Sequence, residues 1–102
     1  MQKEFIVSTN KSIELVDITN KVESVVKDSG VEDGMCLIFV PHSTAAIIIN
    51  ENESGLLKDW EKFLSQLTPD IEYKHNQIDN NAASHLLAGL IVTLLFFANQ
   101  AP

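Results

Sequence analysis

Three histidines are the residues best suited to chemistry in this chain of 102 residues. His42 follows a proline, His75 follows a lysine, and His85 comes shortly after an Asp-Asn-Asn cluster at 79–81. Three imidazoles and one water would form an open tetrahedral site, which leaves a divalent ion one position free. We therefore consider His42, His75 and His85 as candidate metal ligands.

Spacing alone does not establish such a site, because no two of the histidines stand three or four residues apart. In the alternative interpretation, His42 and His75 are loop residues bonded to the backbone, and His85 faces solvent or core from a helix. In a metal site, Asp79 would fix the tautomer of a histidine or act as a further ligand.

Polar residues near His42 form a second set of candidates. Ser43 and Thr44 could contact a phosphate, or they could simply satisfy the turn that contains them. Glu51 and Glu53 directly follow an apolar run, where a carboxylate could bind a cation or act as a general base. The alternative for these carboxylates is helix capping, since Glu is favoured at the start of a helix.

Composition restricts the kind of partner. The chain carries 14 acidic and 7 basic side chains, which gives a formal net charge of −7. Such a surface repels phosphate backbones and anionic lipid, so neither nucleic acid nor a membrane is expected as a partner. An acidic protein can still bind a phosphorylated small molecule where a metal ion reverses the local field.

Length and hydropathy favour a single cytoplasmic domain over residues 1–102. Cys36 is the only cysteine, so no disulfide can form within the chain, and its apolar neighbours predict that it is buried. The N-terminus lacks the long apolar stretch of a signal peptide. The apolar tract 86–98 is shorter than the roughly 20 residues that span a bilayer, so we expect it in the core.

The elements that must position the candidates are predicted strands and helices. Segments 4–8 and 13–17 predict a hairpin, and the apolar runs 35–40 and 45–49 predict buried strands on either side of His42.

Helical patterns cover about residues 20–29, closed by Gly30, then 53–68, and finally 82–90 after the Asp-Asn-Asn cluster. The apolar segment 91–97 then has no later strand to pair with, and we expect a partner for it within the fold or on another subunit.

Taken in order, these motifs resemble the YjbQ-like family, the secondary thiamine-phosphate synthase group. The matching segments are Asp-Ile-Thr (17–19), His-Ser-Thr and the run after it (42–53), Leu-Thr-Pro (67–69), Tyr-Lys-His (73–75) and Asp-Asn-Asn-Ala-Ala-Ser-His-Leu (79–86). They occur in the family's order and spacing over residues 1 to about 91. Several motifs in one register make the resemblance far more specific than any single motif.

The resemblance implies an α+β fold, in which a mixed or antiparallel sheet curls into a sandwich or barrel with flanking helices. It also implies assembly as a homotrimer. Family members continue past the position of Ile91 with closing strands. The resemblance therefore predicts that this domain is truncated or frame-shifted after about residue 91 and lacks those C-terminal strands.

The resemblance further implies a divalent metal ion, zinc or magnesium, held by the three histidines. The implied reaction joins hydroxymethylpyrimidine diphosphate to a thiazole phosphate. On this basis Asp79, Ser43 and Thr44 are the candidate catalytic residues, and Asn81 and Glu51 are the candidate substrate-binding residues. The alternatives are a non-catalytic trimeric protein that binds a divalent metal, and an inactive truncated remnant.

Overall fold

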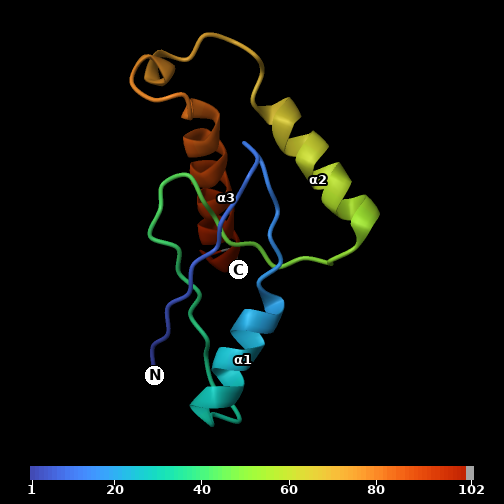
Figure 1. Cartoon of the computed structure of the whole chain (residues 1–102), viewed down its shortest axis with the longest axis vertical. Coiled ribbons are helices and arrows are strands. Elements are labelled where there is room, and N and C mark those ends of the chain that lie inside the picture. Colours follow the sequence, from blue (N-terminus) through green and yellow to red (C-terminus); the bar gives the residue numbers. More distant parts are fainter. Residues whose placement is uncertain (101–102) are drawn as a thin grey trace.

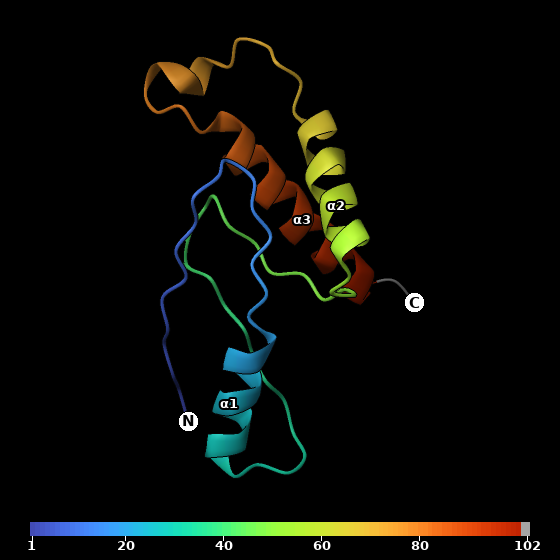
Figure 2. The ribbon, with the colours of Figure 1, turned by 45° about the vertical axis from the view of Figure 1, so that its right-hand side comes forward.

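Helices and long extended segments make up the computed structural model, which describes the backbone of residues 1–100 and the side chains of residues 1–91. The helices are α1 (Thr19–Ser29), α2 (Ser54–Leu67), the short 3-10 helix η1 (Lys74–Gln77) and α3 (Ala82–Gln100). Figures 1 and 2 show α1 at one end of the molecule, with η1 at the other end in the connection between α2 and α3. The molecule measures 49 × 36 × 30 Å along its principal axes.

Helix α1 ends at Gly30 as its sequence predicts, but it begins slightly earlier than predicted, at Thr19, with Ile18 in the N-cap position. The Asp17 carboxylate accepts hydrogen bonds from the backbone N–H of Thr19 (2.9 Å) and from its hydroxyl (2.5 Å). This acceptor satisfies a donor at the helix start, which would otherwise have no partner within the helix. At the other end Gly30 adopts the left-handed conformation with φ of 72°, and its N–H donates to the carbonyl of Lys27.

Helix α2 is capped by Glu53, whose carboxylate accepts a hydrogen bond from the backbone N–H of Leu56. The capping interpretation of this carboxylate is therefore confirmed. Leu64 is the buried residue of α2, and the Trp60 and Phe63 rings contact each other edge to face with centroids 6.1 Å apart.

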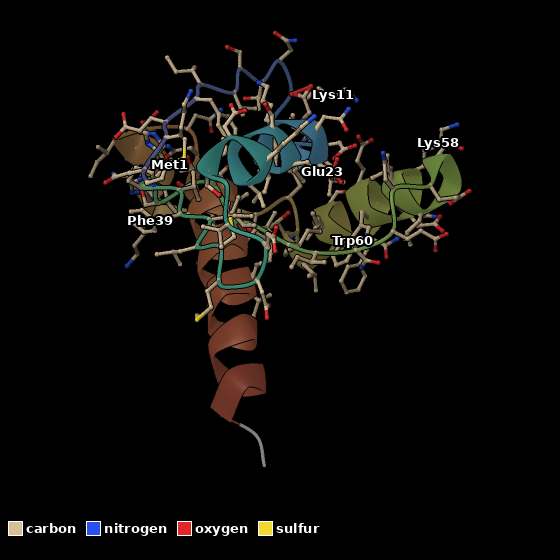
Figure 3. All side chains as sticks on the ribbon, turned by 90° about the horizontal axis from the view of Figure 1, so that it is seen from below. Met1, Lys11, Glu23, Phe39, Lys58 and Trp60 are labelled. Atoms are coloured by element: carbon tan, nitrogen blue, oxygen red, sulfur yellow. The ribbon has the colours of Figure 1, made fainter. Side chains whose placement is uncertain are left out.

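Helix α3 begins at the predicted residue but runs on to Gln100, beyond the predicted end. A side chain of η1 starts it, since Asn76 Oδ1 accepts a 3.0 Å hydrogen bond from the N–H of Ala82. Figure 3 shows the C-terminal part of α3 extending away from the other elements. We predict a packing partner for the apolar segment 91–97. Apart from Ile91, the side chains of this segment lie outside those that the structure describes.

The buried core is small within residues 1–91, whose side chains the structure describes. Among the side chains described, those that are both buried and hydrophobic are Leu64 of α2 and Ala82, Leu87 and Ala88 of α3. A core of this size leaves little hydrophobic stabilisation to oppose the conformational entropy of the chain. No helix in the described part of the chain has the length and apolar character needed to cross a membrane.

The predicted sheet is wrong. Within residues 1–100 the structure contains no strand, so the α+β sandwich or barrel is replaced by helices joined by extended segments. No backbone hydrogen bond between described residues joins one of the predicted strands to another. An apolar, β-branched run favours an extended backbone, but a strand forms only where a neighbouring segment supplies N–H and C=O partners.

The segment 35–40 shows this most clearly. Its side chains at alternate positions are exposed rather than buried, with relative accessibilities of 102% for Met35, 90% for Leu37 and 76% for Phe39. Phe39 is labelled in Figure 3. Cys36 is also exposed, which contradicts its predicted burial. The segment predicted as a buried strand is therefore largely exposed, and no strand lies beside it within residues 1–100.

Candidate functional site

Two of the three histidines meet where η1 approaches the start of α3. His75 lies in η1 and His85 in the first turns of α3, and their rings contact edge to face with centroids 4.7 Å apart. The N–H of His85 donates to the carbonyl of Asn81, so the helix itself fixes its backbone. Residues ten positions apart are thereby brought together by the turn between the two elements.

A chain of polar contacts orients the His75 ring. His75 Nε2 lies 2.9 Å from Asn81 Oδ1, and Asn81 Nδ2 donates to Asp79 Oδ2 at 3.4 Å. Since Asn81 uses its amide nitrogen on the carboxylate, its oxygen accepts from an Nε2–H of His75. A neutral His75 then keeps the lone pair on Nδ1, which can bind a cation or accept a proton.

Both rings line a shallow cleft of about 360 Å³, whose walls are Tyr73, Lys74, His75, Ala82, His85 and Leu86. Tyr73 is held in place by its hydroxyl, which donates a 2.8 Å hydrogen bond to the carbonyl of Pro69. His75 is exposed and His85 is half-buried, so a ligand can reach both rings from solvent.

The third histidine lies elsewhere. His42 is exposed just before the turn at Ser43 and Thr44, two residues that are also exposed. In the part of the chain that the structure describes, no group of three His, Cys, Asp or Glu side chains is close enough to hold a metal ion. The structure therefore brings together His75 and His85 with Asn81 and Asp79, but not the segment that carries His42.

Glu51 is also separate from the cleft. It is exposed, and its N–H donates to the side chain of the preceding residue, Asn50, at 2.8 Å. Nearby Glu53 is occupied at the start of α2, where hydrogen bonds from the N–H groups of Leu56 and then Gly55 lower the pKa of its carboxyl.

Two residues of this region were not predicted from the sequence as site residues. Asn76 caps α3, and Lys74 lines the same cleft as the two imidazoles. Lys74 lies in the Tyr-Lys-His motif and directly precedes the candidate ligand His75, so its sequence position could have indicated it. Nothing in local spacing points to Asn76, because it caps a helix that begins six positions later.

Known proteins match this chain over most of its length. A family model described as UPF0047 protein YjbQ-like matches residues 3–98. A UPF0047 protein of Methanothermobacter thermautotrophicus is 49% identical over 90 residues, which cover 87% of this chain and 63% of that protein. The UPF0047 protein YugU of Bacillus subtilis is 32% identical over 92 residues, which cover 89% of this chain and 70% of YugU.

A solved structure is similar as well. The crystal structure of a YbjQ-like protein of unknown function from Sulfolobus solfataricus P2 superposes with a TM-score of 0.78 and 50% sequence identity, over 82% of this chain and 62% of that one. The chain thus spans less than two thirds of the length of this protein and of the Methanothermobacter relative. With a family match that covers nearly every residue, the chain belongs to the UPF0047 YjbQ-like family.

Proposed function

We propose that the cleft between η1 and α3 is the metal site of a secondary thiamine-phosphate synthase-like transferase. The observation that carries the proposal is the contact between His75 and His85, two candidate ligands from separate elements, beside a cleft open to solvent. The link from Asp79 through Asn81 to His75 Nε2 supports it further. Outer contacts of this kind are typical of metal-binding histidines, whose tautomer they fix.

The donor atoms fit zinc better than magnesium. Imidazole nitrogen is a common ligand of zinc, whereas magnesium prefers oxygen atoms in octahedral geometry. His75 and His85 would supply two ligands, and we propose His42 as the third. In that case the exposed segment that carries His42 must approach the cleft when the ion binds.

In the proposed reaction, the bond between the pyrimidine methylene carbon and the diphosphate oxygen breaks, and the diphosphate leaves with the electron pair. The thiazole nitrogen donates its lone pair to the same carbon, so no other reactant is required. When bound, the metal supplies positive charge that stabilises the departing anion. Asp79 acts as a positioning residue through Asn81, while Ser43, Thr44 and Glu51 are proposed to contact the substrate when their segments approach.

The proposed partners follow from the same assignment. The substrate is a phosphorylated small molecule, and the proposed assembly is a homotrimer. Exposed apolar side chains such as Met35 and Leu37 favour association, because a monomer gains by removing such surface from water.

One observation favours a second candidate, a non-catalytic role for the metal. The core holds four buried hydrophobic residues among those described, so an ion that ties η1 to α3 would add stability that packing does not supply. In this case zinc would raise the unfolding temperature without any coupling activity.

Elemental analysis of the purified full chain tests the metal site. We expect stoichiometric zinc in the unmodified protein and its loss in His75→Ala. Asn80→Ala is the matched control, since no hydrogen bond is assigned to its side chain, and it should retain zinc. Full zinc content in His75→Ala would overturn the assignment.

A coupling assay with hydroxymethylpyrimidine diphosphate and thiazole phosphate then separates the two roles. Product formed by the zinc-loaded chain, but not by His75→Ala, supports the enzyme. Zinc binding that raises the unfolding temperature without product supports the non-catalytic role. If neither binding nor product is found, the chain is an inactive remnant of its family.

A further inference from the structure

The charge of the cleft is opposite in sign to that of the whole chain. The protein has a formal net charge of −7, yet none of the six residues that line the cleft is acidic. Lys74 contributes a full positive charge, and His75 and His85 contribute imidazoles that can donate hydrogen bonds or carry a proton. The cleft is thus a local basic region on an acidic surface.

The positive charge of Lys74 is not neutralised by an ion pair. Within the described residues the one ion pair joins Lys11 to Glu61, at 3.5 Å on a different part of the surface. The acidic residues nearest to Lys74 in sequence, Asp70, Glu72 and Asp79, do not line the cleft. The Asp79 carboxylate accepts from the Asn81 amide instead.

We propose that Lys74 is a specificity-determining residue that makes the cleft select ligands carrying a phosphate or diphosphate group. The inference deepens the proposed function, because it concerns the same cleft and names the residue that attracts the anionic part of the substrate. A lysine amine is a compact cation with three donors, and it binds phosphate oxygens through charge-assisted hydrogen bonds. Lys74 lines the same cleft as the proposed ligands His75 and His85 but is not itself proposed as a ligand.

The test is a titration of the full chain with inorganic diphosphate, after metal has been removed with a chelator that is then dialysed away. Nitrogen-detected signals of the histidine rings report on the cleft. We expect saturable shifts of His75 and His85, with no saturable shift of His42. Sodium chloride at the same ionic strength should not produce them.

Charge variants identify the residue responsible. Lys74→Gln should weaken the affinity for diphosphate at least about fivefold, the effect of losing a charge-assisted hydrogen bond. Lys58→Gln removes the same charge from an exposed position of α2 and should leave the affinity unchanged. Equal effects of the two variants, or no effect of Lys74→Gln, would overturn the proposal.

Lys74→Arg keeps the charge and tests whether the weaker diphosphate affinity of Lys74→Gln comes from a change in structure. It should retain diphosphate affinity, with helical circular dichroism equal to that of the unmodified chain. Loss of affinity in this variant with unchanged dichroism would also contradict the proposal. Because the titration uses metal-free protein, its failure leaves the zinc measurement standing, and failure to bind zinc does not affect the titration.

Discussion

The Asn52 amide donates a 2.9 Å hydrogen bond to Asp17 Oδ2 and thereby joins two segments that lie 35 positions apart in sequence. The other carboxylate oxygen of Asp17 caps α1 through Thr19. One carboxylate therefore connects the start of α1 to the segment that leads into α2. These bonds are exposed to solvent, so each contributes modestly, but together they link two elements of a chain whose described core is small.

Replacing Asp17 should therefore destabilise the protein more than replacing its partner. Asp17→Ala removes the cap and the long-range bond together, and we expect its unfolding temperature to fall by several °C. Asn52→Ala removes the long-range bond alone and should cause a smaller decrease. Thermal unfolding followed by circular dichroism measures both, and equal decreases would show that the cap contributes nothing.

Acid should destabilise the protein through the same carboxylates. The hydroxyl of Thr19, followed by its N–H, lowers the pKa of Asp17 below its ordinary value of 3.8, and the N–H of Leu56 lowers the pKa of Glu53 below 4.5. Carboxyls with a lowered pKa in the folded state add stability above their ordinary pKa and lose it as the pH falls through the folded value.

The unfolding temperature should consequently decline as the pH falls below 4.5 and then below 3.8. A series of thermal unfolding curves at decreasing pH measures this decline. In Asp17→Asn the decline should be shallower at the acid end, since one of the two titrating caps is gone. An identical pH profile for this variant would contradict the assigned role of Asp17.

The bond between Asn81 and His75 predicts an effect on metal affinity. Asn81→Ala removes the acceptor of the Nε2 proton, so the ring loses its fixed tautomer and orientation. We expect zinc affinity to fall about tenfold, the lower end of the range for outer contacts of metal ligands. Competition with a chromophoric chelator measures the affinity, and Asn80→Ala is the control.

If Asn81 only supported the local structure, its replacement would not change the tautomer of His75. The nitrogen chemical shifts of His75 should report a proton on Nε2 in the unmodified chain and a mixture of tautomers in Asn81→Ala. If the affinity falls while the tautomer stays the same, Asn81 acts by another route and the positioning role is wrong.

The sequence predicted the helices far better than the sheet. Gly30 and Glu53 were identified correctly, because caps and left-handed stops depend on a few neighbouring residues. The start of α3 at Ala82 was also correct, although its cap is Asn76 and not the predicted cluster at 79–81. The predicted strands depend on a partner segment that local sequence does not specify. Met35 and Leu37 belong to a continuously apolar run that predicts a buried strand, yet both are exposed, and no strand lies beside this run within residues 1–100.

The candidate site was predicted only in part, also because local sequence does not specify long-range contacts. His75 and His85 meet because η1 and α3 are adjacent along the chain, joined by the turn at 78–81. His42 lies on a segment that only long-range contacts could bring to the cleft, and no local pattern fixes those contacts. Its membership of the metal site therefore remains a prediction, which zinc analysis of His42→Ala can test.

The core of α3 offers a matched pair of leucines. Leu87 is buried with 7% exposure, while its neighbour Leu86 is 56% exposed. Leu87→Ala should lower the free energy of unfolding by about 2–4 kcal/mol through lost burial and a cavity. Leu86→Ala should lower the free energy of unfolding by well under half of that amount. Urea unfolding measures the difference, and equal costs would show that α3 does not pack as described.

Two glycines provide the sharpest test of the backbone. A Cβ at Gly30 or at Gly89 would meet no atom within 4 Å, so crowding does not distinguish the sites. Gly30 has a φ of 72°, which an alanine adopts only with strain, whereas Gly89 lies within α3.

Gly30→Ala should therefore destabilise the chain by roughly 1 kcal/mol, because the end of α1 must keep its left-handed residue or fray. Gly89→Ala should instead stabilise it by about 0.5–1 kcal/mol, since alanine loses less backbone entropy in a helix. Urea unfolding of both variants measures whether each substitution raises or lowers the free energy of unfolding. Effects of the same sign would mean that either the stop of α1 or the helical state of α3 is absent in solution.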